Sequence, residues 1–378
     1  MKKIDPNKLK QNIENIANYD ISQNNISGCA YWVLQDKETV YKNCFGTFPC
    51  STIPICDNTI FRLASMTKPI TAVAALILVD RGLLKLSDPV TKYLPEFENI
   101  RITRLDEQGN LISLGKAKKP ITVKHLLSHT SGIESGSLKR EKMTAEDKKC
   151  VDSTVKFFAE CGLDFEPESK SEYSAFGAFD VLVKIIELVS KQDFYDFIKK
   201  EIFLPCGMTD TVFAPTQEQL GRIVPMHKKE NGQNAIEQMP ENCTFEDFPS
   251  SHRLGGAGLF STLHDYSRFA TMLLNGGTFN ETQILSCKTL SLINKPANDF
   301  CIMSGCEKCG LSVRVVCGEE YKVLPVGSYG WSGAYGPHFW IDPENKIAAV
   351  FMKNSRFDGG AGNASARAFE KSVHDSLE

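Results

Sequence analysis

Hydrophobic positions along the chain follow two spacings, and the strand-like spacing occurs near both ends. Short apolar runs separated by polar turns are typical of β-hairpins. Apolar positions that recur every three or four residues are typical of amphipathic helices. The pattern predicts strands at Cys29–Leu34, Thr39–Tyr41, Cys309–Val316, His338–Ile341 and Ile347–Met352, with hairpin turns at Gln35–Glu38 and Asp342–Asn345. It predicts helices at Pro6–Ala17, Thr67–Arg81, Val123–His129, Ala145–Cys161, Gly177–Ser190, Phe194–Ile202, His264–Leu274 and Ala364–Leu377.

The order of these segments predicts an α+β fold. Strands from both ends of the chain can pair into one antiparallel sheet flanked by the terminal helices, with a helix-rich lobe inserted between them. We expect a single domain over 1–378, with an α/β lobe at about 1–85 and 255–378 and a helix-rich lobe at about 86–254. The polar stretch Lys228–Phe248 lacks periodicity and is interpreted as a surface excursion. An active site is expected where the lobes meet, because ligand clefts favour such junctions.

Composition and charge exclude several classes of function. The 378 residues are 42% apolar with a net charge of -3, and no dense run of lysine and arginine could track nucleic-acid phosphates. The longest largely apolar run, Ile70–Val79, is too short for a membrane span, which needs about 20 residues. The amino terminus has no apolar core of a signal peptide, so we expect a cytoplasmic protein without a membrane span.

Thirteen cysteines are scattered along the chain. An odd number without a signal peptide favours reduced thiols over a disulfide framework. The cluster Cys301, Cys306, Cys309 and Cys317 contains one C-x-x-C pair, but it has neither a second pair nor a nearby histidine to complete a zinc site. We therefore expect small buried thiols and no metal or organic cofactor.

Candidate chemistry begins at Ser65-Met66-Thr67-Lys68, just before an apolar helical pattern. A serine and a lysine three positions apart lie on one face of a helix. A neutral lysine there can take the serine's proton, so the pair is a candidate nucleophile with its own base. Alone, this spacing is equally typical of an exposed helix start with a capping serine.

Two further segments could complete such a site. Tyr173, just before the predicted helix at Gly177, offers a phenol that could exchange a proton with the pair, and an adjacent lysine is expected to lower its pKa. The glycine-rich segment Gly330–Gly336 could run close beside a ligand. Its backbone N–H at Ala334, together with that of Ser65, could form an oxyanion hole.

Other residues fit the chemistry less well. The chain has no G-x-S-x-G elbow, which argues against an α/β-hydrolase triad. His129 ends a short predicted helix, and we interpret it as structural rather than catalytic. Glu172, Tyr335 and His338 flank the candidate segments and are expected to line the cleft without an assigned role.

Taken in order, these segments resemble the serine β-lactamase-like hydrolases of the class C type, a family that includes D,D-peptidases, low-molecular-weight penicillin-binding proteins and esterases. The resemblance runs from Cys29 to Phe369 and includes Leu126–Gly132, Pro205–Thr211 and Gly255–Thr262. It implies a nucleophilic role for Ser65, a partner role in deprotonation for Lys68, and a second base at Tyr173. Which of the two bases acts at each step is left open by the sequence.

Two departures from the family pattern bear on the substrate. The usual Tyr-x-Asn motif has Ala175 in its third position, and the usual Lys or His of the last motif is Trp331, followed by Ser332 and Gly333. Losing a charge-assisted contact of about 1.5–3 kcal/mol weakens anionic substrates by roughly tenfold to a hundredfold. Trp331 in this position resembles the esterase branch. Among ester, amide and lactam substrates, we therefore expect small uncharged esters.

Three alternatives remain at this point. The first two are β-lactamase and D-amino-acid peptidase activity. The third is a catalytically weak binding or sensor module for peptides or cell-wall fragments, which the loss of the asparagine at Ala175 keeps open. The oligomeric state is not indicated by the sequence.

Overall fold

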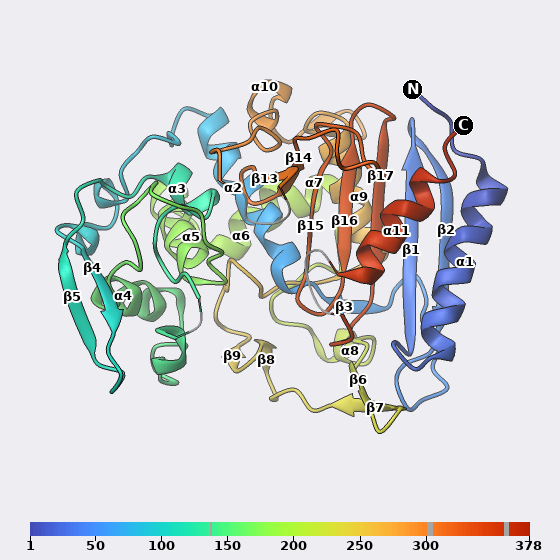
Figure 1. Ribbon diagram of the computed structural model, residues 1–378, viewed down its shortest axis with the longest axis horizontal. Coiled ribbons are helices and arrows are strands. Elements are labelled where there is room, and N and C mark those ends of the chain that lie inside the picture. The colour runs from blue at the N-terminus through green and yellow to red at the C-terminus, as the bar shows by residue number, and fades with distance from the viewer. Residues whose placement is uncertain (137, 301–304, 359–362) are drawn as a thin grey trace.

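A seven-stranded antiparallel sheet forms one side of the molecule (Figure 1). The computed structural model describes residues 1–136, 138–300, 305–358 and 363–378. Strands from both ends of the chain make up the sheet, which confirms the predicted α+β fold. In spatial order they are β13 (Glu307–Cys309), β14 (Arg314–Val316), β15 (Tyr329–Ser332), β16 (His338–Asp342), β17 (Ile347–Met352), β1 (Gly28–Gln35) and β2 (Glu38–Gly46).

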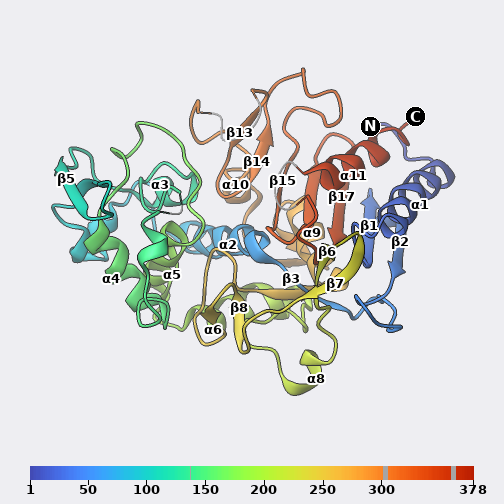
Figure 2. The ribbon, with the colours of Figure 1, turned by 60° about the horizontal axis from the view of Figure 1, so that its bottom comes forward.

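Helices cover both faces of this sheet. The terminal helices α1 (Pro6–Ser22) and α11 (Ala364–His374) lie side by side on one face, as both ribbon views show (Figures 1 and 2). Their apolar side chains pack on an aromatic cluster in which the rings of Tyr31 and Phe351 stack at 4.5 Å. Helix α9 (Leu263–Leu274) packs on the opposite face, against β1, β16 and β17.

On the other side of the molecule, several helices surround α2 (Thr67–Asp80). This helix is buried along nearly its whole length, and it packs against α5 (Gly177–Ser190). This packing holds α2 in place, and with it the turn just before the helix that contains Ser65. The other helices and helical turns are α3 (Val123–Leu127), α4 (Val151–Cys161), α6 (Phe194–Ile198), α7 (Leu204–Cys206), α8 (Gln217–Leu220), α10 (Cys287–Leu290), η1 (Ala64–Met66), η2 (Val90–Lys92), η3 (Pro95–Phe97), η4 (Arg140–Lys142) and η5 (Lys199–Phe203).

Ten short strands outside the main sheet form five two-stranded ladders in the described part of the chain. The ladder between β3 and β10 brings the segment before Ser65 beside the segment that follows the Gly255–Gly258 motif. The ladders are β3 (Ile60–Arg62) with β10 (Phe260–Thr262), β4 (Arg101–Leu105) with β5 (Leu111–Lys116), β6 (Met226–Glu230) with β7 (Gln233–Glu237), β8 (Cys243–Phe245) with β9 (Phe248–Pro249), and β11 (Thr278–Phe279) with β12 (Thr282–Gln283).

Several predicted elements need correction. The stretch Cys309–Val316 is not one strand: left-handed backbone at Ser312 turns the chain, and β13 pairs with β14 as a hairpin. The helix expected from Ala145 begins only at Val151, because the Asp147 side chain accepts hydrogen bonds from Thr144 and holds a turn there. The predicted surface excursion after residue 228 contains two of the small ladders.

Both predicted hairpins of the main sheet are confirmed. Strands β1 and β2 turn at Asp36 and Lys37, which both have positive φ, and strands β16 and β17 flank the turn after Asp342. The division into lobes near residues 86 and 254 stays a prediction. Within the described ranges, no helix is both long and apolar enough to span a bilayer.

Candidate active site

The candidate nucleophile lies on a strained turn at the start of α2. Ser65 is the middle residue of η1, and the residue before it, Ala64, is buried with a φ of 46°. A non-glycine residue in this left-handed region costs free energy, and such strain gathers at functional sites. Ser65 itself is only partly buried, so part of its surface is accessible to solvent.

Three of the predicted residues meet at this turn. Ser65 Oγ lies 2.6 Å from the hydroxyl oxygen of Tyr173 and 3.4 Å from Lys68 Nζ. Lys68 reaches the serine from one turn further along the helical segment, as its spacing predicts. Tyr173 arrives from the loop before α5, more than 100 positions later in the chain. The serine hydroxyl therefore contacts two groups that can exchange its proton.

The protonation of the Lys68 amine depends on its burial and on two backbone carbonyls. Its amine is fully buried and donates to the carbonyl oxygens of Ala175 at 2.7 Å and Gly256 at 2.8 Å. Burial lowers the pKa of Lys68 to about 7, although the nearby carboxylates of Glu134 and Asp180 act in the opposite direction. Near neutral pH the amine is therefore half deprotonated, whereas an ordinary lysine is charged.

The neutral form of Lys68 has the geometry of a base. A neutral amine has two N–H groups and one lone pair. The carbonyls of Ala175 and Gly256 occupy both N–H groups, so the lone pair is left for the Ser65 hydroxyl. This arrangement was not visible in the sequence, because both acceptors are backbone atoms from distant segments.

The Gly255–Gly258 segment, which the sequence singled out without a role, supplies one of these carbonyls. A Cβ atom on Gly256 would lie 2.3 Å from the Ala175 carbonyl oxygen and 3.2 Å from Lys68 Nζ, so only glycine fits. The segment is fixed from behind by Asp180, which accepts from the Gly255 N–H at 3.1 Å. Asp180 also accepts from the ring of His252 at 2.8 Å, inside the protein.

The pKa of Tyr173 moves in the direction opposite to the prediction. Burial of its hydroxyl group raises the pKa well above the ordinary value of 10, and the contacts with Ser65 and Trp331 only partly oppose this effect. The residue as a whole is 37% exposed, but its hydroxyl lies against Ser65 in a desolvated part of the cleft. Lys68 is not among the groups that lower the pKa of Tyr173. Tyr173 therefore carries its proton at neutral pH.

The glycine-rich third segment lies directly beside the nucleophile turn. A Cβ atom on Gly333 would lie 2.2 Å from the Leu63 carbonyl oxygen, so glycine permits this close approach. Ala334, the next residue, is partly exposed. Among the described residues, neither its backbone N–H nor that of Ser65 has a hydrogen-bond partner. An oxyanion hole needs two such donors, so these two N–H groups stay its predicted components.

Trp331 faces the catalytic residues. Its ring centre lies 6.0 Å from that of Tyr173 and 6.2 Å from that of His129, and the indole is almost completely buried. Its N–H lies near the Tyr173 hydroxyl and lowers that group's pKa somewhat, but it makes no full hydrogen bond to a described residue. Trp331 thus places an apolar ring at the position where the family pattern has a Lys or His that could attract a carboxylate.

The side chains of Ser332 and His338 do not line the cleft, which corrects their prediction as substrate-binding groups. Successive residues of a strand point to opposite faces, so Ser332 points away from the face of Trp331. Its hydroxyl lies 2.7 Å from His338 Nδ1, and His338 Nε2 lies 2.9 Å from Glu370 on α11. All three side chains are buried beneath the terminal helix. They connect the sheet to α11 and have no access to substrate.

His129 supports Tyr173 from behind. Its Nδ1 accepts from the Ser174 N–H at 3.1 Å, and its ring centre lies 4.8 Å from the Tyr173 ring centre. Burial and the neighbouring Lys68 lower the pKa of His129 to about 3, so the ring is neutral. These contacts agree with the structural interpretation. Of the other cleft candidates, Tyr335 is fully buried and stacks on Phe245, and Glu172 pairs with Lys170.

Cysteines near the carboxyl-terminal strands form no described metal site. Cys309 is buried, Cys306 and Cys317 are half-buried, and Cys301 lies outside the described residues. Throughout the part of the chain that the structure describes, no three His, Cys, Asp or Glu side chains are arranged to hold a metal ion.

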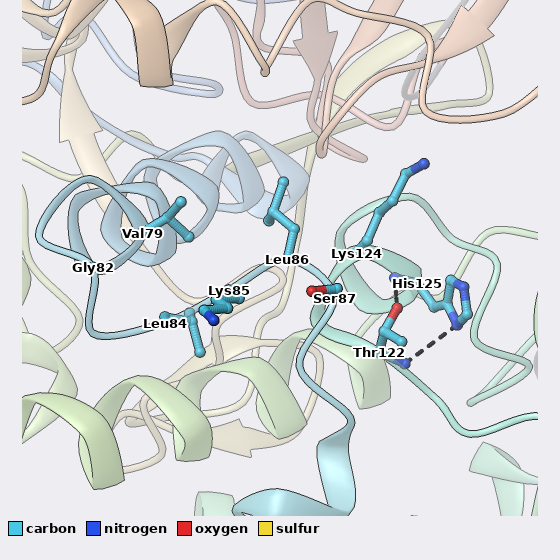
Figure 3. A pocket seen from close by; sticks show the side chains of 9 residues that line it. All are labelled: Val79, Gly82, Leu84, Lys85, Leu86, Ser87, Thr122, Lys124 and His125. Carbon is cyan, nitrogen blue, oxygen red and sulfur yellow. Dashed lines mark hydrogen bonds between the residues drawn. The ribbon is translucent and has the colours of Figure 1, made fainter.

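A separate hollow of about 690 Å³ lies at the far end of α2 (Figure 3). Val79 and Leu86 line it with lysines and with His125, whose ring accepts from the Thr122 backbone N–H. Because α2 rises about 1.5 Å per residue, this hollow is roughly 20 Å from Ser65. None of the predicted site residues lines it.

Comparisons with known proteins agree with this geometry. A family model described as Beta-lactamase matches residues 9–371. The chain is 29% identical over 353 residues to Protein Rv1367c of Mycobacterium tuberculosis, covering 86% of this chain and 85% of that protein. It is 25% identical over 390 residues to Esterase EstB of Burkholderia gladioli, covering 95% of this chain and 94% of that protein.

A solved structure shows the same fold. The chain superposes on EstCE1, described as a hydrolase with promiscuous acyltransferase activity, with a TM-score of 0.82 and 22% identity. The match covers 98% of this chain and 99% of that one.

Proposed function

This chain belongs to the Beta-lactamase family, and from that membership we propose that it is a serine esterase that forms an acyl-enzyme at Ser65. The observation that carries the proposal is the double contact of the Ser65 hydroxyl, with Tyr173 at 2.6 Å and with the buried amine of Lys68 at 3.4 Å. Lys68 is the base and Tyr173 the acid in this proposal, because their pKa values are shifted in those directions.

The proposed reaction has two steps. Ser65 Oγ attacks the ester carbonyl while its proton passes to neutral Lys68, and the backbone N–H groups of Ser65 and Ala334 stabilise the oxyanion. As the carbon–oxygen bond to the leaving alcohol breaks, Tyr173 gives that oxygen a proton and regains one from Lys68. Water then attacks the acyl-enzyme carbonyl: Tyr173 takes the proton of the water while it passes its own proton to neutral Lys68. Protonated Lys68 returns that proton to Ser65 Oγ as the bond between this oxygen and the acyl carbon breaks, which releases the acid and restores Ser65.

The preference for uncharged esters rests on the walls of the site. Trp331 places an indole beside Tyr173, and Ala175 contributes a backbone carbonyl to Lys68 rather than a side-chain amide to substrate. The buried amine of Lys68 is only partly charged near neutral pH and already donates to two carbonyls, so it is a weak partner for a carboxylate. Arg62, a nearby cation, donates to the carbonyls of Cys243 and Thr244.

A fluorophosphonate probe tests the nucleophile. We expect the probe to label the protein, labelling to disappear in Ser65→Ala, and labelling to persist in Ser131→Ala, whose serine is buried and accepts the Ile133 N–H. The labelled peptide is identified by mass spectrometry. Absence of labelling in the intact protein over a range of pH would reject the acyl-enzyme and favour a binding module.

A substrate panel tests the choice of acyl donor. We expect p-nitrophenyl acetate and butyrate to be hydrolysed with a higher kcat/KM than nitrocefin or a D-alanyl-D-alanine peptide. Efficient nitrocefin turnover without ester cleavage would contradict the proposed role of Trp331. Cleavage of the peptide alone would instead identify a peptidase.

Restoring the charged pattern is expected to shift specificity. The double variant Ala175→Asn with Trp331→Lys should raise kcat/KM for a carboxylate-bearing ester, relative to its methyl ester, by roughly tenfold to a hundredfold. The reason is a charge-assisted hydrogen bond that the indole cannot make. Trp331→Phe keeps an apolar ring at the same position, so it is the control and should leave the ratio unchanged. An unchanged ratio in the double variant would mean that other residues select the substrate.

A further inference from the structure

The segment Tyr173–Gly177 places Tyr173 beside Ser65, but its capping residue has no side chain that can cap the helix that follows. Helix α5 begins at Gly177, and the capping residue Phe176 has no side-chain hydrogen bond to offer. The first backbone N–H groups of a helix need partners from elsewhere. Because Tyr173 directly precedes this helix start, whatever satisfies these groups also fixes the position of the tyrosine.

Glu134 satisfies them from a different part of the chain. Its Oε2 accepts from the backbone N–H groups of Phe176 and Gly177, both at 2.6 Å, and from the Ser174 hydroxyl at 3.1 Å. The side chain is completely buried, and its backbone has a φ of 50°, which is unusual for a non-glycine residue. A strained, buried acid thus accepts from three groups of the Tyr173–Gly177 segment.

Burial raises the pKa of the Glu134 carboxyl group above its ordinary value, but the contacts around it favour the carboxylate form. The two backbone N–H groups can only donate, and so can Arg140, which lies 3.4 Å from Oε1. Ser174 Oγ accepts from the Ala178 N–H at 3.1 Å, so its own proton points to Glu134. The two backbone N–H groups and Arg140 cannot accept a hydrogen from a protonated acid, so three of the four partners favour the carboxylate. A negative charge at the start of α5 is also favoured by the helix dipole.

Resting on the proposed acyl-enzyme function, we propose that Glu134 is a positioning residue of the active site, whose buried carboxylate holds the Tyr173–Gly177 segment so that the Tyr173 hydroxyl meets Ser65. Glu134 touches neither Ser65 nor the space for substrate. It acts through Tyr173, and its charge also acts on Lys68. The charged groups around Lys68 are Glu134, Asp180 and Arg140, and the first of these has the largest effect.

Labelling rates over a range of pH test this role. In Glu134→Gln, we expect the plateau rate of fluorophosphonate labelling at Ser65 to fall by about tenfold to a hundredfold, because a small misplacement of a catalytic group is costly. On the acid side of the pH profile, the labelling rate should fall as Lys68 becomes protonated, so this acid limb is expected near pH 7 in the wild type. In Glu134→Gln, the acid limb should move to lower pH. Removing a negative charge near the amine destabilises its protonated form.

Two further variants separate positioning from stability. Glu134→Asp keeps the charge but shortens the side chain, so it should lower the plateau without moving the acid limb. Glu187→Gln is a matched control: Glu187 lies near the opposite end of α5 from the Tyr173–Gly177 segment, and it accepts from the Phe194 N–H at 3.2 Å. It should lower the midpoint of thermal unfolding and leave both the plateau and the limb unchanged.

The outcomes distinguish this proposal from the proposed function. A wild-type protein that is labelled, with Glu134→Gln matching it in plateau and limb, overturns the positioning role alone. If Glu134→Gln does not fold, Glu134→Asp decides, and a wild-type plateau in that variant overturns the role. A wild type that is never labelled overturns both proposals, because Ser65 is then not a nucleophile. The probe reports on Ser65 itself, so a protein that is labelled but cleaves no ester rejects only the proposed substrate.

Discussion

Replacing Lys68 with methionine is expected to slow acylation of Ser65 by about a thousandfold or more. Removing a general base costs about two to four orders of magnitude, and here the same group also polarises the nucleophile. Methionine has similar volume and fills the buried space but has no lone pair of comparable basicity. The burst of p-nitrophenol from p-nitrophenyl acetate at pH 8, where wild-type Lys68 is mostly neutral, measures the loss.

The same replacement should change how the free energy of unfolding depends on pH. Lys68 holds its proton up to about pH 10.5 in the unfolded chain but only up to about pH 7 in the folded protein. Between these values the unfolded chain binds more protons, so rising pH stabilises the wild-type fold. Relative to Lys68→Met, the wild type should gain about 2 kcal/mol between pH 7 and pH 9. Urea unfolding of both proteins at these two pH values measures this difference.

Lys353 provides the matched control for this experiment. It is also fully buried, but its amine donates to the carboxylate of Asp358 at 2.6 Å and to Ser365 at 3.1 Å. Lys353→Met leaves a carboxylate without its partner, so it should lower stability and have little effect on the burst rate. A burst of normal rate in Lys68→Met would show that Tyr173 or water is the base. Equal pH dependence of unfolding in both proteins would show that buried Lys68 is charged.

Local patterns in the sequence predicted the elements that short-range chemistry determines. The turn at Asp36 and Lys37 follows from alternation on both sides of two polar residues, and the helix at Thr67 follows from a long apolar run. The run Cys309–Val316 was wrong because apolar composition cannot distinguish one buried strand from a tight hairpin of two. The turn there depends on left-handed backbone at Ser312 and on pairing with β15.

The candidate site shows the same limit. Ser65 and Lys68 were found because their spacing on a helix is a local property, and Tyr173 was found from the motif around it. The sequence could not show which face of β15 lies in the cleft, so Ser332 was placed there with Trp331. It gave no signal for Glu134 either, because its three acceptor contacts bridge 40 to 43 positions and exist only in the folded chain.

Replacing Tyr173 with phenylalanine is expected to affect esters according to their leaving groups. Ethyl butyrate releases an alkoxide that needs a proton, so loss of the tyrosine acid should lower its kcat/KM by about a hundredfold to ten-thousandfold. p-Nitrophenolate departs without a proton, so p-nitrophenyl butyrate should lose less than about tenfold. The acyl group is the same in both esters, and the ratio of the two rates therefore reports on protonation of the leaving group.

Tyr266→Phe is the control for this comparison. Its hydroxyl donates to the Met66 carbonyl at 2.9 Å, next to the nucleophile turn, but does not contact Ser65. It should change both rates by the same small factor. If Tyr173→Phe slows both esters equally, the phenol holds the serine in place and is not the acid. If the alkyl ester alone is slowed, Tyr173 is the acid that protonates the leaving alcohol. The raised pKa of Tyr173 then has a role in catalysis, because burial keeps on the phenol the proton that the alcohol receives.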